Sequence, residues 1–179
     1  MRQFGENYCM DLKQRIRHVP DFPKAGILFY DITTLLRDAE GFKATIDMMS
    51  APYVDKDIEL VVGIESRGFI LGAAVAQRIG TGFIPIRKPG KLPAKSVKAS
   101  YALEYGTDAL EMHEDAIGKG HRVLIVDDVL ATGGTAAAAA TLVKQLGGEL
   151  FGMAFLIELS FLNGREKLPG EKVFSVLQY

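Results

Sequence analysis

From Leu60 onward the sequence alternates short apolar runs with longer stretches of helical periodicity. Helices are expected over Phe69–Ile79 and over the alanine-rich stretch Thr135–Leu146. The short runs are apolar throughout rather than at every second residue, and they are Leu60–Ile64, Phe83–Ile86, Val123–Val126 and Gly152–Leu159. Strands of this kind are buried on both faces, which is typical of a parallel sheet. We therefore predict an α/β fold with a central, mostly parallel sheet flanked by helices.

The region before Leu60 has a different pattern. A first helix is expected over about Tyr8–Arg17, ending before Pro20, because its apolar residues share one helical face. A second helical pattern runs through Phe42, Ile46 and Met49. We interpret the apolar positions of both helices as core.

A chain of 179 residues has the usual size of one domain, and we predict a single domain over residues 1–179. Residues 88–116 interrupt the alternation of strands and helices. Two segments within this region, Ser100–Leu103 and Ala109–Met112, favour a hairpin. Long insertions in compact domains are usually lids or disordered segments, so we expect a flexible hairpin lid over about residues 88–116.

The most informative motif follows the run Val123–Val126. Two carboxylates, Asp127 and Asp128, come first, and a loop with two adjacent glycines then leads into the alanine-rich helix. Ligands of open parallel sheets bind beyond the carboxyl ends of the strands. A helix N-terminus offers unpaired N–H groups and a partial positive charge to a phosphate. The residues expected to bind that phosphate are Ala131, Thr132, Gly133, Gly134 and Thr135.

Asp127 and Asp128 would repel a phosphate, so they are better suited to sugar hydroxyls or to a hydrated Mg²⁺. The motif therefore predicts a ribose 5-phosphate site, and a capped surface turn is the alternative. The chain contains neither G-x-x-x-x-G-K-[ST] nor G-x-G-x-x-G, which excludes a P-loop and a dinucleotide fingerprint.

This motif resembles the phosphoribosyl-diphosphate signature of the type I phosphoribosyltransferases. Other segments between about Arg15 and the C-terminus resemble the adenine branch of that family, namely Asp21-Phe22-Pro23, Glu65–Phe69, Arg87–Pro93 and Leu103–Gly106. The resemblance implies transfer of a phosphoribosyl group from 5-phosphoribosyl 1-diphosphate to adenine, giving AMP and pyrophosphate in purine salvage. It also implies a homodimer, and an N-terminal hood of about residues 1–35 that is joined by the C-terminal segment.

Pyrophosphate leaves readily only when its charge is neutralised, and basic residues follow two of the expected strands. The resemblance implies that pyrophosphate is bound by Glu65, Ser66, Arg67, Arg87, Lys88 and Lys91. It also implies a cis peptide bond between Glu65 and Ser66 and a catalytic contribution from Arg67. Solvated surface charge is the alternative for Arg67 and Arg87, and a nucleic-acid patch is the alternative for the basic run that begins at Arg87.

By the same resemblance, Glu104 in the lid is the general base that takes the proton from a ring nitrogen of adenine. The base pocket is expected to be formed by Leu28, Phe29, Tyr30, Val129 and Leu159. Tyr30 stands where many family members carry arginine. A transferase for hypoxanthine, guanine or xanthine is therefore an alternative.

Charge and composition limit the remaining partners. The chain has 21 Lys and Arg against 22 Asp and Glu, whereas a duplex nucleic-acid binder normally has a basic excess. No run approaches the ~20 apolar residues of a membrane span, and one cysteine, Cys9, suggests a reducing compartment. We expect a cytoplasmic enzyme with Mg²⁺ bound mainly through its substrate, without a direct protein metal site, nucleic-acid partner or membrane partner. A ligand-sensing regulator on the same fold is the alternative to an enzyme.

Overall fold

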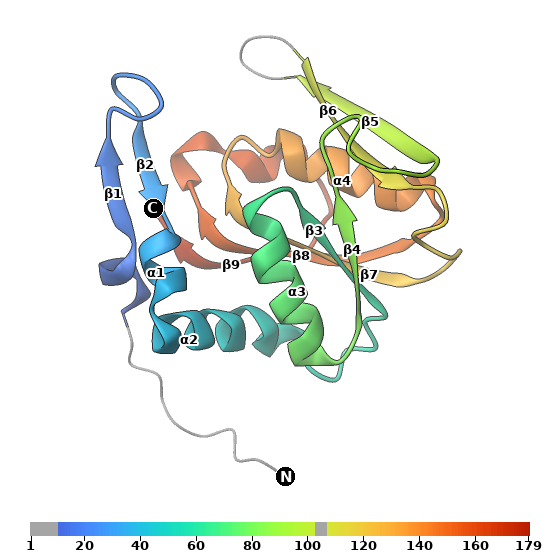
Figure 1. The fold of residues 1–179 in the computed structure, drawn as a ribbon, viewed down its shortest axis with the longest axis horizontal. Coiled ribbons are helices and arrows are strands. Elements are labelled where there is room, and N and C mark those ends of the chain that lie inside the picture. The colour runs from blue at the N-terminus through green and yellow to red at the C-terminus, as the bar shows by residue number, and fades with distance from the viewer. Residues whose placement is uncertain (1–10, 103–106) are drawn as a thin grey trace. The chain divides into compact units, whose positions relative to one another are not determined.

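The computed structural model describes residues 11–102 and 107–179, and the chain divides into two compact units, residues 1–48 and 49–179. The elements of the N-terminal unit are the 3₁₀ helix η1 (Leu12–Arg15), strands β1 (Arg17–Pro20) and β2 (Leu28–Asp31), helix α1 (Thr33–Arg37) and most of helix α2 (Ala39–Ser50) (Figure 1). The helix expected around Phe42, Ile46 and Met49 is confirmed as α2.

The prediction of a helix over Tyr8–Arg17 is wrong for residues 11–17, the part that the structure describes. Only the single turn η1 is helical, begun by Asp11, whose carboxylate accepts a hydrogen bond from the Lys13 N–H at 3.0 Å. Arg17 already belongs to β1, which pairs antiparallel with β2. An aromatic contact stabilises this hairpin: the rings of Phe22 in the turn and Phe29 in β2 are edge-on, with centroids 5.1 Å apart.

The second unit is built on a five-stranded parallel sheet of order β4-β3-β7-β8-β9. Its elements in chain order are η2 (Ala51–Tyr53), β3 (Leu60–Ile64), α3 (Arg67–Ile79), β4 (Gly82–Ile86), β5 (Ser96–Ala102), β6 (Thr107–His113), β7 (Arg122–Leu130), α4 (Gly134–Gln145), β8 (Glu149–Glu158), η3 (Ser160–Leu162), η4 (Gly164–Lys167) and β9 (Val173–Gln178). The predicted α/β class and parallel sheet are confirmed.

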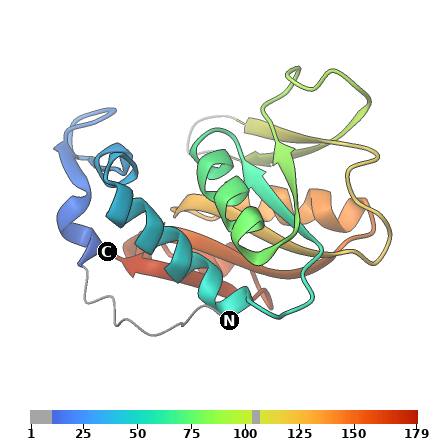
Figure 2. The same cartoon turned by 60° about the horizontal axis from the view of Figure 1, so that its bottom comes forward.

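Two crossover connections leave the middle of this sheet in opposite directions. The unit β3-α3-β4 runs to one edge, and β7-α4-β8 runs toward the other. Since such crossovers are right-handed, α3 and α4 cover opposite faces of the sheet, and Figure 2 shows the two helices from a second side. The adjacent strands β3 and β7 form a topological switch point, where the carboxyl ends of strands open into a ligand site.

Both faces of the sheet are buried, which explains the continuous apolar runs. On one face, Val62 and Ile64 share a core cluster with Leu142 of α4 and Leu110 of β6. On the other face, Gly63 allows α3 to approach, because a Cβ there would lie 2.8 Å from the carbonyl oxygen of Gly68. The sequence alternation therefore reflects helices packed on both sides of one sheet.

The hairpin expected within residues 88–116 is confirmed as β5 and β6, with Ser100 opposite Ala109. Its strands pack against α4 in the same core cluster as the sheet. Residues 103–106, which connect the two strands, are outside the described residues.

Two strands differ from their predicted form. β7 does not end before Asp127 but continues through both aspartates to Leu130, because β8 pairs along it as far as Glu158. The edge strand β9 was not predicted, because its residues are only half-buried and give no continuous apolar signal. Neither difference changes the order of the elements around the phosphate motif.

Phe155→Ala tests the packing of the core. Phe155 in β8 is 1% exposed, so its truncation leaves a cavity and should lower the free energy of unfolding by about 3–5 kcal/mol. Phe161 in η3 is 66% exposed, and Phe161→Ala is the matched control, expected to change stability little. Urea unfolding of both variants measures the difference, and equal stability losses would contradict this packing.

Candidate active site

Two loops meet at the carboxyl ends of β3 and β7. Gly68, in the first turn of α3, lies so close to Asp127 that a Cβ would stand 2.6 Å from the Asp127 carboxylate. The Arg67 guanidinium forms an ion pair with Asp128, with Nε and Oδ2 separated by 2.7 Å. The structure therefore brings together the predicted pyrophosphate loop and the predicted acid pair.

The loop after β7 encloses a pocket at the N-terminus of α4. Its lining consists of Asp127 and residues 129–136, which include every residue from the predicted phosphate loop. Gly133 takes a left-handed conformation with φ +79°, which glycine adopts without a Cβ penalty. The first N–H groups of a helix lack intrahelical partners, so this pocket is suited to an anion.

The acid pair lies in a low-dielectric environment. Burial raises the pKa of Asp127 well above its usual value, and the neighbouring charge of Asp128 raises it further. Burial also raises the pKa of Asp128, although the charge of Arg67 opposes that effect. The Asp127 carboxylate accepts a hydrogen bond from the Asp128 N–H at 2.9 Å. The pair thus combines hydrogen-bond acceptors with a limited capacity to hold two negative charges.

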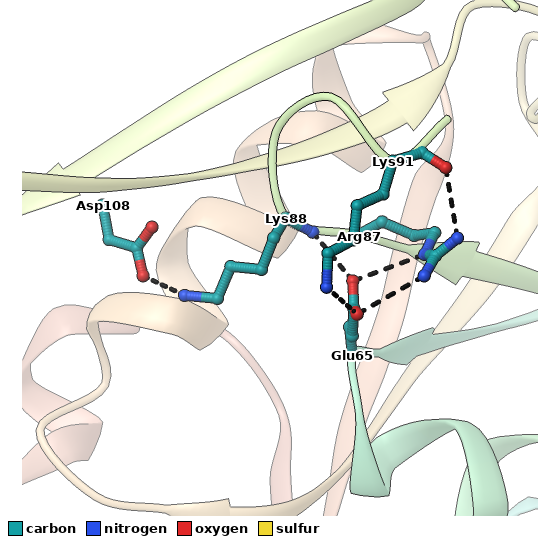
Figure 3. A network of polar contacts seen from close by, with 5 residues as sticks. All are labelled: Glu65, Arg87, Lys88, Lys91 and Asp108. Atoms are coloured by element: carbon teal, nitrogen blue, oxygen red, sulfur yellow. Dashed lines mark hydrogen bonds and ion pairs between the residues drawn. The ribbon is translucent and has the colours of Figure 1, made fainter. Parts of the chain in front are cut away.

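Hydrogen-bond donors from the residues after β4 converge on the Glu65 carboxylate (Figure 3). Lys91 Nζ lies 2.6 Å from Oε1, Arg87 donates from Nε to Oε2 at 3.3 Å, and the Lys88 N–H donates to Oε2 at 3.1 Å. These donors, Lys91 first, lower the pKa of Glu65 from 4.5 to about 2. The Glu65 N–H donates to the Ile86 carbonyl at 3.0 Å, so that group is used within the sheet rather than for an anion. The Glu65–Ser66 peptide bond is cis, as expected.

The same cations are connected to the hairpin. Lys88 forms an ion pair with Asp108 of β6, which also accepts a hydrogen bond from the Tyr101 hydroxyl at 3.2 Å. Arg87 and Glu111 exchange backbone hydrogen bonds at 3.0 and 2.8 Å. The hairpin of β5 and β6 is therefore attached directly to the basic cluster, which consists of Arg87, Lys88 and Lys91. Glu104 itself lies outside the described residues.

The predicted base-pocket residues belong to two different units. Leu28, Phe29 and Tyr30 form β2, and the Tyr30 ring stands edge-on to His18 with ring centroids 5.2 Å apart. Val129 is the penultimate residue of β7, and Leu159 directly follows β8. The Leu159 N–H donates to the Leu130 carbonyl at 2.9 Å. Their role toward the base remains a prediction.

Comparison with known proteins agrees with this geometry. Residues 33–178 match the phosphoribosyl transferase domain family. The adenine phosphoribosyltransferase of Solibacter usitatus is 62% identical over 169 residues, which cover 94% of this chain and 98% of that protein. The chain belongs to the adenine phosphoribosyltransferase family.

Solved structures of family members share the fold. The adenine phosphoribosyltransferase of Thermoanaerobacter pseudethanolicus superposes with a TM-score of 0.92 at 50% identity, covering 94% of this chain and 98% of that one. The Saccharomyces cerevisiae adenine phosphoribosyltransferase, solved with adenine and an iminoaltritol bisphosphate, has a TM-score of 0.88 at 44% identity. The alignment covers 93% of this chain and 96% of the yeast chain.

Sequence reasoning missed several residues that shape this phosphoribosyltransferase site. Asp108 and Glu111 engage the basic cluster from β6, and Gly164 lies against the phosphate loop. No local pattern marks Gly164, because it meets Gly133 only through the tertiary fold. Asp108 lies at the turn of the expected hairpin, where an aspartate is common for structural reasons, so the sequence did not mark it as a site residue.

Glu65→Gln tests the electrostatics of the basic cluster. Since the folded-state pKa of Glu65 is depressed, the carboxylate contributes stability above pH 4.5 that is lost as pH falls toward 2. We therefore expect Glu65→Gln to unfold at a lower urea concentration than the wild type at neutral pH. The difference between the two urea midpoints should shrink as the pH falls from 4.5 toward 2. Glu166→Gln, at an exposed position in η4, is the control. A gap that stays constant from neutral pH to pH 2 would contradict the ionic contribution.

Proposed function

We propose that this chain transfers the phosphoribosyl group of 5-phosphoribosyl 1-diphosphate to adenine, forming AMP and releasing pyrophosphate in purine salvage. The observation that carries this proposal is the meeting of two loops at the switch point. Gly68, at the start of α3, lies against Asp127, near the end of β7, so a cationic site and a glycine-lined phosphate pocket share the carboxyl end of the sheet. The likeness to adenine phosphoribosyltransferases over nearly the whole chain supports adenine as the base.

The 5-phosphate of the substrate would occupy the pocket at the N-terminus of α4. Backbone N–H groups of the loop and the hydroxyls of Thr132 and Thr135 are its donors. Asp127 and Asp128 would then face the ribose, where each carboxylate accepts hydrogen bonds from vicinal hydroxyls. The ion pair with Arg67 fixes Asp128 for that task.

The pyrophosphate would bind at the basic cluster with Arg67, Arg87, Lys88 and Lys91, beside the loop of Glu65 and Ser66. Arg87 and Lys91 contact the Glu65 carboxylate, and Arg67 contacts Asp128. We propose that the substrate's diphosphate oxygens add to or replace these contacts. The cations then stabilise the charge that develops as the bond between C1′ and the pyrophosphate oxygen breaks.

Mg²⁺ fits this arrangement as a substrate-bound ion. Within residues 11–102 and 107–179, no group of three or more His, Cys, Asp or Glu side chains could hold a metal. Mg²⁺ at phosphate-transfer sites keeps waters and is bound through one or two carboxylates and substrate oxygens. Asp127 and Asp128 would contact such an ion through its waters rather than directly, and the ion would neutralise charge on the leaving pyrophosphate.

Glu104 is our proposed general base. As C1′ separates from pyrophosphate, the adenine ring nitrogen forms the new bond to C1′, and the proton of that nitrogen passes to the Glu104 carboxylate. The family motif Leu103–Gly106 supports this role. The hairpin's attachment to the basic cluster through Lys88 and Asp108 supports a link between this segment and pyrophosphate binding.

The single-domain organisation, the homodimer, the cytoplasmic location and the hood contacts to adenine remain predictions. None of the described helices combines the length and apolar character needed to span a bilayer. Light scattering of the purified protein tests the dimer, and cell fractionation tests the location.

A base-selectivity assay tests the function. Purified protein is mixed with Mg²⁺, 5-phosphoribosyl 1-diphosphate and one of adenine, hypoxanthine, guanine or xanthine, and the nucleotides are separated. We expect AMP from adenine and little product from the other bases. IMP, GMP or XMP as the main product would overturn the base assignment and implicate Tyr30. If the protein binds 5-phosphoribosyl 1-diphosphate but forms no nucleotide from any base, the result would favour a ligand-sensing regulator.

Glu104→Gln tests the general base. The amide keeps the shape but cannot take the proton, so kcat should fall by about 10²–10⁴-fold, while the Kd for 5-phosphoribosyl 1-diphosphate changes little. Glu114→Gln, an exposed glutamate just beyond β6, is the control and should retain wild-type kcat. An unchanged kcat for Glu104→Gln would exclude Glu104 as the base.

A further inference from the structure

The segment that follows β8, residues 159–168, contacts the phosphate loop, residues 131–135. It contains the two short helices η3 and η4, and its backbone is held by local hydrogen bonds, such as Leu162 N–H to Leu159 carbonyl at 3.0 Å. Leu168 ends the segment in the core, only 4% exposed. The chain is therefore anchored at both ends where it passes the loop.

Gly164 makes the contact with the loop through its backbone. A Cβ on Gly164 would stand 2.2 Å from the Ala131 carbonyl oxygen, and a Cβ on Gly133 would stand 2.1 Å from the Gly164 carbonyl oxygen. Two chain segments therefore meet with no room for a side chain on either. Because packed backbones cannot interpenetrate, the position of Gly164 limits the conformations open to Ala131–Gly133.

The neighbouring Arg165 fixes the position of Gly164. Its guanidinium forms a bidentate ion pair with Glu158, at 2.6 Å from Nε to Oε1 and 2.7 Å from Nη2 to Oε2. Its Nη1 also donates to the Val173 carbonyl at 3.1 Å. Glu158 ends β8 and is buried, so Arg165 connects the segment to two strands of the sheet. A bidentate pair specifies geometry as well as supplying energy.

We propose that the Glu158–Arg165 ion pair is a positioning device for the phosphate loop, acting through the backbone contact of Gly164 with Ala131 and Gly133. Neither charged residue lines the pocket. The inference rests on the proposed role of residues 131–135 as the 5-phosphate site. Donors aimed at a phosphate tolerate little displacement, since a misplacement of about 1 Å can cost on the order of 10²-fold in rate.

The test compares Arg165→Met with Arg165→Lys. We measure the Kd for ribose 5-phosphate by calorimetry, and kcat and the two KM values by steady-state kinetics. In Arg165→Met the Kd for ribose 5-phosphate and the KM for 5-phosphoribosyl 1-diphosphate should rise by about 10- to 100-fold. The KM for adenine should stay near the wild-type value. Arg165→Lys keeps the charge and one hydrogen bond and should recover part of the loss.

The control is Arg122→Gln. Arg122 begins β7 and forms an ion pair with Asp57 at 3.6 Å, at the end of the strand away from the loop. Its loss should leave phosphate affinity unchanged. A purely structural role for Arg165 would lower the melting temperature of Arg165→Met without changing its Kd for ribose 5-phosphate, and that result would overturn the proposal.

Gly164→Ala provides a second route to the same outcome. It leaves the ion pair in place but forces the two backbones apart, so it should also weaken ribose 5-phosphate binding. The double variant of Gly164→Ala and Arg165→Lys should lose less binding free energy than the sum of the two single variants, because both substitutions act through one contact. Wild-type protein that fails to bind ribose 5-phosphate would refute the proposed function. Wild-type binding with no change in Arg165→Lys or Gly164→Ala would refute only this inference.

Discussion

The parallel pairing of β3 with β7 is the constraint on which the site depends. These neighbouring strands send their crossovers to opposite edges of the sheet, so the loops that follow them open toward each other. Gly68 permits their close approach, since a larger residue would collide with the Asp127 carboxylate. The segment after β3 carries Arg67, and the loop after β7 surrounds the N-terminus of α4, while the segment after β4 adds Arg87, Lys88 and Lys91 from the other side of β3. The pairing of β3 with β7 thus places the two ends of a phosphorylated substrate.

The electrostatics of the two loops differ in a way that suits this division. Around Glu65 the donors are abundant, and they stabilise the charged carboxylate. Around Asp127 and Asp128 burial dominates and raises both pKa values, although the charge of Arg67 and nearby hydrogen bonds act against it. A diphosphate oxygen is chemically similar to the carboxylate oxygen that Arg87 and Lys91 already contact. The basic cluster is therefore organised for an anion by its own glutamate, which reduces the rearrangement that binding requires.

Much of this organisation could be predicted from the sequence where local patterns agree with the fold. β3 is a continuous apolar run, and α3 and α4 have strong helical patterns, so these elements were predicted. Residues 131–135 combine glycines with a helix start, which predicted the pocket. Prediction failed where tertiary pairing decides. β7 extends past Asp127 because β8 continues beside it, and the turn at Leu12 ends early because β1 pairs with β2. The Glu158–Arg165 pair has no local signature, and Glu104 lies beyond the described residues.

The backbone contact between Gly133 and Gly164 also has a consequence for biosynthesis. The glycine loop and α4 leave the ribosome before β8 and η4 have been made, so a nascent chain that has reached only α4 lacks the surface that supports the loop. In vectorial synthesis, the substrate pocket would thus acquire its final form later than strands β3, β4 and β7, which leave the ribosome before it.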